Sequence, residues 1–395
     1  MASIISATTT SGLVSTADNS GDLQFQTQNG ANTITLPSSS GTLATTANLS
    51  GLGFKNRIIN GAMVIDQRYG GTATANTISG YTVDRWVVVQ VSTTGKLIAQ
   101  QNAGSVTPPV GFSNYLGVTS QSAYSVGASE FYSITQSIEG YNVADLGWGT
   151  ANAKTITLSF WVRSSLTGTF GGALNNGGTR SYPFTYTISA ANTWEQKSIT
   201  IAGDTSGTWG TTNGQGIQVW LGLGVGSTYS GTAGAWAGAN YLGATGSVSV
   251  VGTSGATFYI TGVQLEVGST ATSFDYRPYT TELQLCQRYC WKYGGNAASY
   301  LSGPGLYADG NVIIFGPISN PVSMRAGVSL TVVGSPRVAI NGANSSGWTP
   351  TISGPGDLLN SWIDMTRTGH GLVATVTTNI YLSATSDYFL FTAEL

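Results

Sequence analysis

Three acidic residues in the middle of the chain are the candidates for acid–base chemistry: Glu130, Glu139 and Asp145. Hydrolysis of a glycosidic bond needs two carboxyl groups about 5–10 Å apart, one of them in an apolar setting. Glu139 and Asp145 are each followed by residues typical of strand ends and turns, where carboxylates commonly accept backbone hydrogen bonds. The sequence therefore favours a structural role for them, and we predict that the protein is not an enzyme.

The sequence offers few residues for nucleophilic catalysis or metal binding. The single histidine, His370, would have to be the base of any serine triad, yet it lies between glycines in TRTGHGL, which is typical of a loop tip. Cys286 and Cys290 are four residues apart, a spacing poorly suited to a disulfide on a helix. Two thiolates alone do not make a zinc site. We expect no cofactor and no metal site, with a structural calcium ion as the open alternative.

Aromatic residues are the stronger lead. Trp148, Trp209 and Trp236 lie in the turn-like, glycine-rich contexts LGWGT, GTWGT and GAWAG. An indole ring can stack on the C–H face of a sugar, and a large exposed ring commonly marks a contact site. Burial of the same rings in a subunit interface is the alternative. The candidates for glycan binding are Trp148, Trp209, Trp236, Tyr300, Tyr307 and Trp348.

Composition limits the fold that could position these side chains. The chain has 395 residues, 54 of them glycine, and is only 8% charged, compared with about 25% in typical soluble proteins. Few charges leave helices without their usual solvated face, so short strands joined by Gly-, Ser- and Asn-rich turns are expected. The net charge of −2 and the lack of a basic run argue against nucleic-acid binding. No apolar run approaches the roughly 20 residues of a membrane span, and the first residues do not read as a secretory signal.

Residues 1–53 form a segment of their own. Residues 1–50 contain no tryptophan, tyrosine, lysine or arginine, and their apolar residues lie in short alternating runs spaced about ten residues apart. Such a segment has too little apolar surface for a monomeric core. Three copies wound about one axis could pool these residues, so we predict an extended shaft. A disordered arm is the alternative.

Residues 54–279 predict a β-sandwich. Within Thr155–Arg163 apolar and polar residues alternate strictly, and GIQVWLGLGV repeats the pattern. About eight such strands without a helical period between them indicate two packed sheets of the jelly-roll type. The stretch Gly226–Ser254 is rich in Gly and Ala and is expected to form loops.

Residues 280–295 predict a short helical neck. Thr281 and Gln284 have the spacing of a capping box. A helix of about 12 residues is unstable alone, so it must pack on its flanking domains or on symmetry mates. Its apolar stripe, the candidate trimer contact, consists of Leu283, Cys286, Cys290 and Tyr293. Residues 296–395 return to short strands and predict a small C-terminal β-sandwich or knob.

Four segments carry a resemblance to phage tail-fibre and related virion fibre proteins of the cyanophage or marine type: Phe54–Arg68, Tyr81–Trp86, Val143–Leu174 and Glu266–Lys292. The resemblance implies a homotrimer in the virion, made in the host cytoplasm and attached to tail or other virion proteins through residues 1–53. It also implies a jelly roll similar to carbohydrate-binding modules and a C-terminal tip that faces the host.

From these features the sequence predicts a fibre that recognises host surface polysaccharide, and no catalytic residues follow from the resemblance. Two alternatives remain. One is a tailspike-type enzyme that degrades polysaccharide. The other is a purely architectural capsid fibre or connector.

Overall fold

The computed structural model describes residues 24–27, 32–35, 54–74, 79–92, 95–295, 299–300, 306–307, 311–340, 343–352, 359–368, 378–382, 384 and 387–395. The chain divides into two compact units, Met1–Gly53 and Phe54–Leu395. In the first unit, β1 (Gln24–Thr27) pairs antiparallel with β2 (Asn32–Thr35). Apart from these two strands, the predicted shaft lies outside the described residues.

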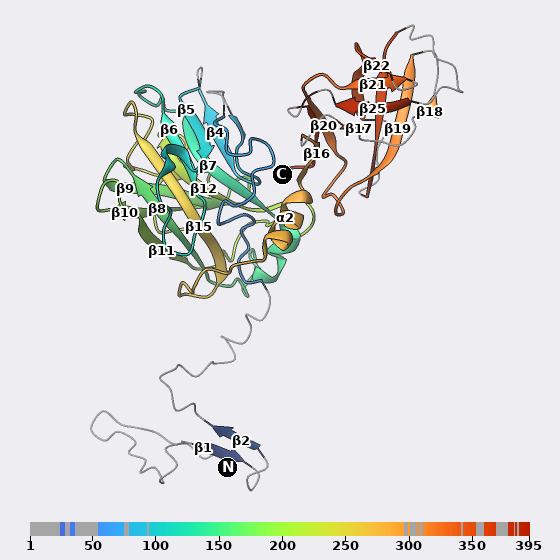
Figure 1. The fold of residues 1–395 in the computed structure, drawn as a ribbon. Helices are drawn as coiled ribbons and strands as arrows, with labels where there is room; N and C mark the ends of the chain where they lie inside the picture. The colour runs from blue at the N-terminus through green and yellow to red at the C-terminus, as the bar shows by residue number, and fades with distance from the viewer. Residues whose placement is uncertain are drawn as a thin grey trace, which may run out of the picture. The chain divides into compact units, whose positions relative to one another are not determined.

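Two antiparallel sheets form the β-sandwich at the start of the second unit (Figure 1). The six-stranded sheet consists of β10 (Ser181–Ile188), β9 (Gly168–Asn175), β12 (Gln215–Val225), β7 (Phe131–Glu139), β4 (Val87–Val91) and β3 (Ser79–Tyr81). The five-stranded sheet consists of β11 (Glu195–Ile201), β8 (Ile156–Ser164), β15 (Thr257–Val267), β6 (Leu116–Ser120) and β5 (Leu97–Gln101). The predicted all-β class is confirmed.

The core lies between these sheets and follows the alternation of the sequence. On β8 the inward side chains are fully buried, and β12 presents its own buried row from the opposite sheet. Side chains of both rows pack in one continuous cluster, because successive residues of a strand point to opposite faces. The two rows are Ile156, Leu158, Phe160 and Val162, and Ile217, Val219, Leu221 and Leu223.

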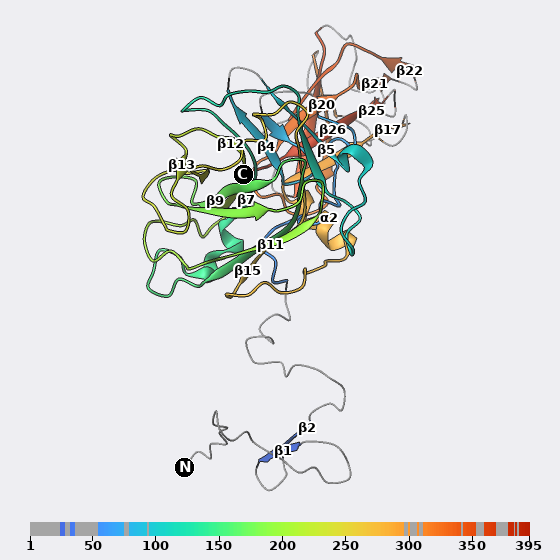
Figure 2. The ribbon, with the colours of Figure 1, turned by 90° about the vertical axis from the view of Figure 1, so that its left-hand side faces the viewer.

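The stretch 226–254 is mostly loop, as expected. It contains one short parallel pair, β13 (Ser230–Gly231; labelled in Figure 2) and β14 (Gly243–Ala244), and β14 lies against β9 and β12 of the six-stranded sheet. Leu242 and Tyr229 from this stretch pack with Phe131 and Trp220 of the sheet. The loop thereby covers an aromatic surface that the sheet alone would expose.

The neck helix is shorter than predicted. α2 spans Tyr279–Gln287, and the chain then forms β16 (Cys290–Gly294), which pairs with β26 (Tyr388–Thr392). The predicted stripe is therefore wrong beyond Cys286, because Cys290 and Tyr293 belong to a strand. Pairing with β26 satisfies the backbone of a segment rich in aromatic and other strand-forming residues, which outweighs the helical pattern. Short 3-10 turns complete the unit: η1 (Ala103–Ser105), η2 (Gly140–Asn142) and η3 (Ala144–Leu146).

The C-terminal part contains three small sheets. One combines β16, β26 and β20 (Ser329–Val333); the second contains β17 (Ser299–Tyr300), β25 (Thr378–Leu382), β21 (Arg337–Ile340) and β22 (Ala343–Ser345). The third contains β18 (Leu306–Tyr307), β19 (Val312–Ser319), β24 (Asn360–Thr366) and β23 (Thr349–Ile352). Their buried side chains form a separate core that includes Trp291, Phe315 and Phe391. No helix among the described residues is long and apolar enough to cross a membrane.

Candidate functional site

A groove opens at the end of the sandwich where β12 ends and β7 begins. Its volume is about 420 Å³, within the range of about 300–1,000 Å³ typical of small-molecule sites. Three chain segments form it: the connection between β6 and β7, the last residue of β12, and the end of the long loop before β15. The lining residues are Ala123, Tyr124, Ser125, Val126, Val225, Ser247, Ser249 and Gly252.

The groove lining is neutral and rich in hydroxyl groups. None of the described residues that line it carries a charge at neutral pH. Ser249 contributes a buried Oγ that makes no hydrogen bond with any described residue. A buried hydroxyl normally has a partner, so this atom is suited to bind a buried water molecule behind the groove lining. Together these groups suit a polar, uncharged ligand.

Tyr124 supplies the only aromatic ring in the described lining. Its hydroxyl donates a hydrogen bond to Glu130 Oε1 at 2.8 Å, and its ring packs edge-on against Tyr132 with centroids 5.9 Å apart. Lys96 Nζ lies 5.1 Å from the centroid of the Tyr124 ring. The backbone N–H of Tyr124 donates to the carbonyl of Val251, which joins two walls of the groove. These contacts hold the ring in one orientation.

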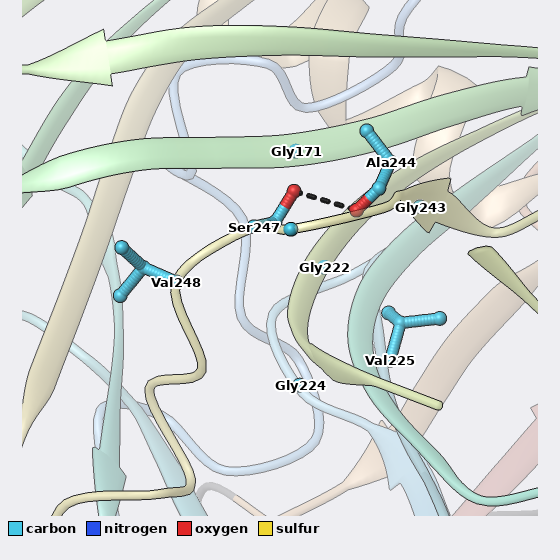
Figure 3. Close-up of a pocket in the computed structure, with 9 residues that line it drawn as sticks. Gly171, Gly222, Gly224, Val225, Gly243, Ala244, Ser247 and Val248 are labelled. Carbon is cyan, nitrogen blue, oxygen red and sulfur yellow. Dashed lines mark hydrogen bonds between the residues drawn. The ribbon is translucent and has the colours of Figure 1, made fainter. Parts of the chain in front are cut away.

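A narrow recess adjoins the groove, since Val225 and Ser247 line both (Figure 3). The recess holds about 40 Å³, about the space of one or two water molecules. Ser247 Oγ donates to the carbonyl of Ala244 at 2.8 Å. A Cβ at Gly171 would lie 2.3 Å from Ser247 Oγ, so only glycine lets the loop approach β9 this closely. Gly171 therefore determines how closely the loop packs on β9 and how deep the recess is.

The structure brings Trp148, Trp209 and Trp236 together at the opposite end of the sandwich. Their rings meet edge to face, with centroids 4.7–5.4 Å apart. Trp148 and Trp209 are only 8% and 9% exposed, and Trp236 is half-buried against Tyr182. Each indole N–H donates to a backbone carbonyl. The prediction of exposed stacking surfaces is therefore wrong for Trp148 and Trp209. Together with Trp236 they form a packed aromatic cluster, which we call the tryptophan plug, and its hydrogen bonds join three loops.

The remaining aromatic candidates are distributed through the C-terminal part. Trp348 is 6% exposed and packs in the C-terminal core, so its predicted role as an exposed contact is wrong. Burial arises because strands distant in the sequence enclose the turn that carries it. Tyr300 and Tyr307 belong to β17 and β18. Their side chains, and the whole of His370, lie outside the described residues.

Glu130 and Glu139 are too far apart to form a hydrolytic pair, and Asp145 is held in an ion pair. Glu130 and Glu139 flank the two ends of β7, a separation of about 30 Å for nine residues of extended chain. Asp145 forms an ion pair with Arg57 at 2.8 Å on the surface. Glu139 is buried and receives hydrogen bonds from Arg288 at 2.6 and 2.9 Å and from the Tyr289 hydroxyl at 2.6 Å. Burial opposes ionisation of Glu139, but these donors outweigh it and lower its pKa.

Glu139 belongs to a buried polar junction between the sandwich and the C-terminal part. Arg85 is fully buried, forms an ion pair with Glu394, and stacks over the Tyr289 ring at 3.6 Å. Arg68 pairs with the same Glu394 at 2.9 Å and with Asp84 at 3.6 Å. Glu394 therefore links two arginines of the sandwich to the end of β26.

Burial raises the pKa of Asp84 to about 6, although Arg68 and hydrogen bonds from Gln67 favour its charged form. The two cysteines lie beside this junction, both buried and free. Burial raises the pKa of both thiols, so neither has the character of a reactive nucleophile. The junction therefore has the chemistry of a structural contact that holds the sandwich and the C-terminal part together.

The predicted trimer-neck residues are covered by their own chain. Cys286 is buried with Ile59 and Ile65, and Leu283 packs against the same cluster. Cys290 is fully buried, and Tyr293 packs on the C-terminal core. Their burial in one copy leaves only the partly exposed edges of Leu283 and Tyr293 for a neighbouring subunit. In the part of the chain that is described, no group of three or more His, Cys, Asp or Glu side chains could hold a metal ion.

A scan against protein-family models and a search of curated protein sequences each found no match. Solved structures with partial likeness include the enzymatically active domain of bacteriophage CBA120 tailspike protein 4, which is 12% identical over 54% of this chain and 21% of that chain, with a TM-score of 0.29. They also include TmCBM61 in complex with β-1,4-galactotriose (10% identity, 54% and 99% coverage, TM-score 0.29). A third is the family 11 carbohydrate-binding module of Clostridium thermocellum (10% identity, 52% and 99% coverage, TM-score 0.25). At TM-scores this low, the likeness carries no conclusion about the ligand or activity of this chain.

Sequence reasoning missed the groove residues. The stretch 226–254 was predicted to form loops, but nothing local indicated that it meets the segment 121–130 between β6 and β7. The antiparallel order of β6, β7, β12 and β15 brings them to one end of the sandwich. Knowledge of strand pairing was therefore the missing signal.

Proposed function

We propose that the protein is a homotrimeric phage fibre or spike protein that binds neutral glycans of the host surface through the groove at the end of its sandwich. The neutral, hydroxyl-lined groove beside the Tyr124 ring is the observation that carries the proposal. Sugars combine apolar C–H faces with many hydroxyl groups. A tyrosine ring with serine hydroxyls and backbone groups offers partners for both.

The composition supports the fibre part of the proposal. Residues 1–53 would attach the protein to tail or other virion proteins and begin the shaft, because their apolar residues are too sparse for a core in one copy. Three copies would present three grooves, and several fibres would multiply them. Avidity of this kind gives firm adsorption from weak single sites. The resemblance of four segments to virion fibre proteins points in the same direction.

The separation of Glu130 from Glu139, and the contacts that hold each candidate carboxylate, support a binding role over hydrolysis. A glycosidase needs two carboxyl groups within about 10 Å of each other. Glu130 is near the groove, but its carboxylate is held by Tyr124 and by the backbone N–H of Gly127. Glu139 is engaged at the junction.

The test uses the full-length chain on immobilised glycans, with neutral cello-, xylo- and galacto-oligosaccharides beside acidic galacturonan fragments. Binding to at least one neutral class and none to the acidic class is expected. Light scattering on the same preparation should give the mass of three chains. A trimer that binds no glycan and no host cell would support an architectural fibre instead. Release of reducing ends from host polysaccharide would indicate an enzyme.

A further inference from the structure

Exposed aromatic rings gather where the second compact unit begins. Phe54, its first residue, is 57% exposed, Tyr276 is 57% exposed and Tyr279 is 62% exposed. Two half-buried rings, Phe112 and Phe274, pack against Tyr276, with centroid distances of 5.5 and 4.9 Å. We call these five residues the entry patch. Exposed aromatic residues grouped in this way commonly mark an interaction site.

Polar contacts hold the patch in place. The backbone N–H of Lys55 donates to Asp275 Oδ2 at 2.9 Å, which fixes the segment that carries Phe54. The Arg277 guanidinium lies 5.3 Å from the centroid of the Phe54 ring and also pairs with Glu282 at 3.2 Å. A side chain at Gly111 would collide with the Tyr276 hydroxyl. The rings therefore lose little conformational freedom when a partner covers them.

The position of the patch in the chain indicates its occupant. Gly53 is joined directly to Phe54, and residues 1–50 carry too few apolar side chains for a core of their own. If three copies pool those residues about one axis, as the proposed function requires, the three Phe54 residues must start near that axis. Tyr276 and Tyr279 of each copy then face a neighbour.

We propose that the entry patch is a contact surface between copies of this chain in the trimer. The inference rests on the homotrimer of the proposed function. In a threefold assembly the contact is heterologous, so the patch of one copy meets a different part of the neighbouring patch. Five aromatic residues cover less area than a stable interface of about 800 Å² per partner, so the entry patch is one part of the trimer contact.

Site-specific crosslinking of the full-length chain tests the proposal. Both native cysteines are buried, so one introduced surface cysteine is the reactive thiol. Tyr279→Cys has a matched control in Tyr141→Cys, because both tyrosines are 62% exposed and only Tyr279 belongs to the patch. With a short bis-maleimide, Tyr279→Cys is expected to form two-chain products at least tenfold faster than Tyr141→Cys. Equal rates in a trimeric preparation would overturn the proposal.

A charge-introducing variant gives a second readout. Tyr276→Glu with Tyr279→Glu would place at least six carboxylates in the interface, and the solution mass should fall below three chains. A retained three-chain mass in this variant would overturn the entry-patch proposal and leave the trimer of the proposed function intact. A one-chain mass for the unmodified protein would overturn both. Loss of glycan binding at unchanged mass would identify the patch as a sugar platform and would also contradict the proposal.

Discussion

The groove and the junction use opposite chemistry. The groove is lined by neutral hydroxyls and backbone groups. The junction contains buried charges that are paired across the domain boundary, with Arg85 and Arg68 both bound to Glu394. Neutral hydroxyl groups suit a ligand that binds and dissociates. Paired buried charges suit a contact that must not open, because breaking it leaves a charge without a partner.

Three of the four segments that resemble virion fibre proteins contribute residues to the junction. Phe54–Arg68, Tyr81–Trp86 and Glu266–Lys292 supply Arg68, Arg85 and Tyr289 to the junction. The groove draws mainly on residues outside these segments. The resemblance gives no information about the sugar that the groove would accept.

The largest expected effect comes from breaking the junction. Arg85→Ala should lower the free energy of unfolding by about 2–5 kcal/mol, because the fully buried side chain leaves a cavity and Glu394 keeps only Arg68 as its partner. Chemical denaturation followed by tryptophan fluorescence measures it. Asp145→Ala, which removes an exposed partner of Arg57, is the control and should cost no more than about 1 kcal/mol. Equal losses in the free energy of unfolding for the two variants would show that the junction stabilises the fold no more than a surface ion pair does.

Comparable losses are expected within the tryptophan plug. Trp148→Ala should cost about 3–5 kcal/mol, since the ring is buried between Trp209 and Trp236. Trp236→Ala should cost clearly less, because the Trp236 ring is half-buried. Thermal unfolding of the two variants measures the difference. If Trp236→Ala preserved stability and abolished glycan binding, the sugar site would lie at the plug rather than at the groove.

Asp84 gives the junction a pH dependence of definite sign. Its pKa rises from 3.8 to about 6 on folding, so the folded state takes up a proton more readily. This term stabilises the fold as pH falls from 7 towards 4, by about 3 kcal/mol at most. Glu139 acts oppositely below its usual pKa of 4.5, because its pKa is lowered and its contribution is lost on protonation.

Asp84→Asn isolates the Asp84 contribution. The free energy of unfolding of the parent minus that of the variant should increase as pH is lowered from 7 to 4. Denaturant midpoints at half-unit pH steps would record the trend. A difference that stays constant over this range would mean that Asp84 does not titrate in the folded protein within it.

The sequence predicted the all-β class and the sandwich core because both depend on local alternation. Ile156, Leu158 and Phe160 could be assigned to the core from period two alone, and all are fully buried. The end of the helix could not be predicted, because Cys290 enters a strand only through pairing with a partner about 100 residues later. Local context also made Trp148 and Trp348 look exposed. Each ring is covered by residues that are distant in the sequence.

Calorimetric titration with a neutral oligosaccharide tests the contrast between groove and junction most directly. The titration compares the full-length chain with Tyr124→Ala in the groove, Asp84→Asn in the junction and Tyr141→Ala as an exposed tyrosine elsewhere. Tyr124→Ala should weaken binding by at least tenfold, about 1.4 kcal/mol, because the stacking ring is lost. Asp84→Asn and Tyr141→Ala should stay within about twofold of the parent. Unchanged affinity in Tyr124→Ala, or a tenfold loss in folded Asp84→Asn, would contradict the account.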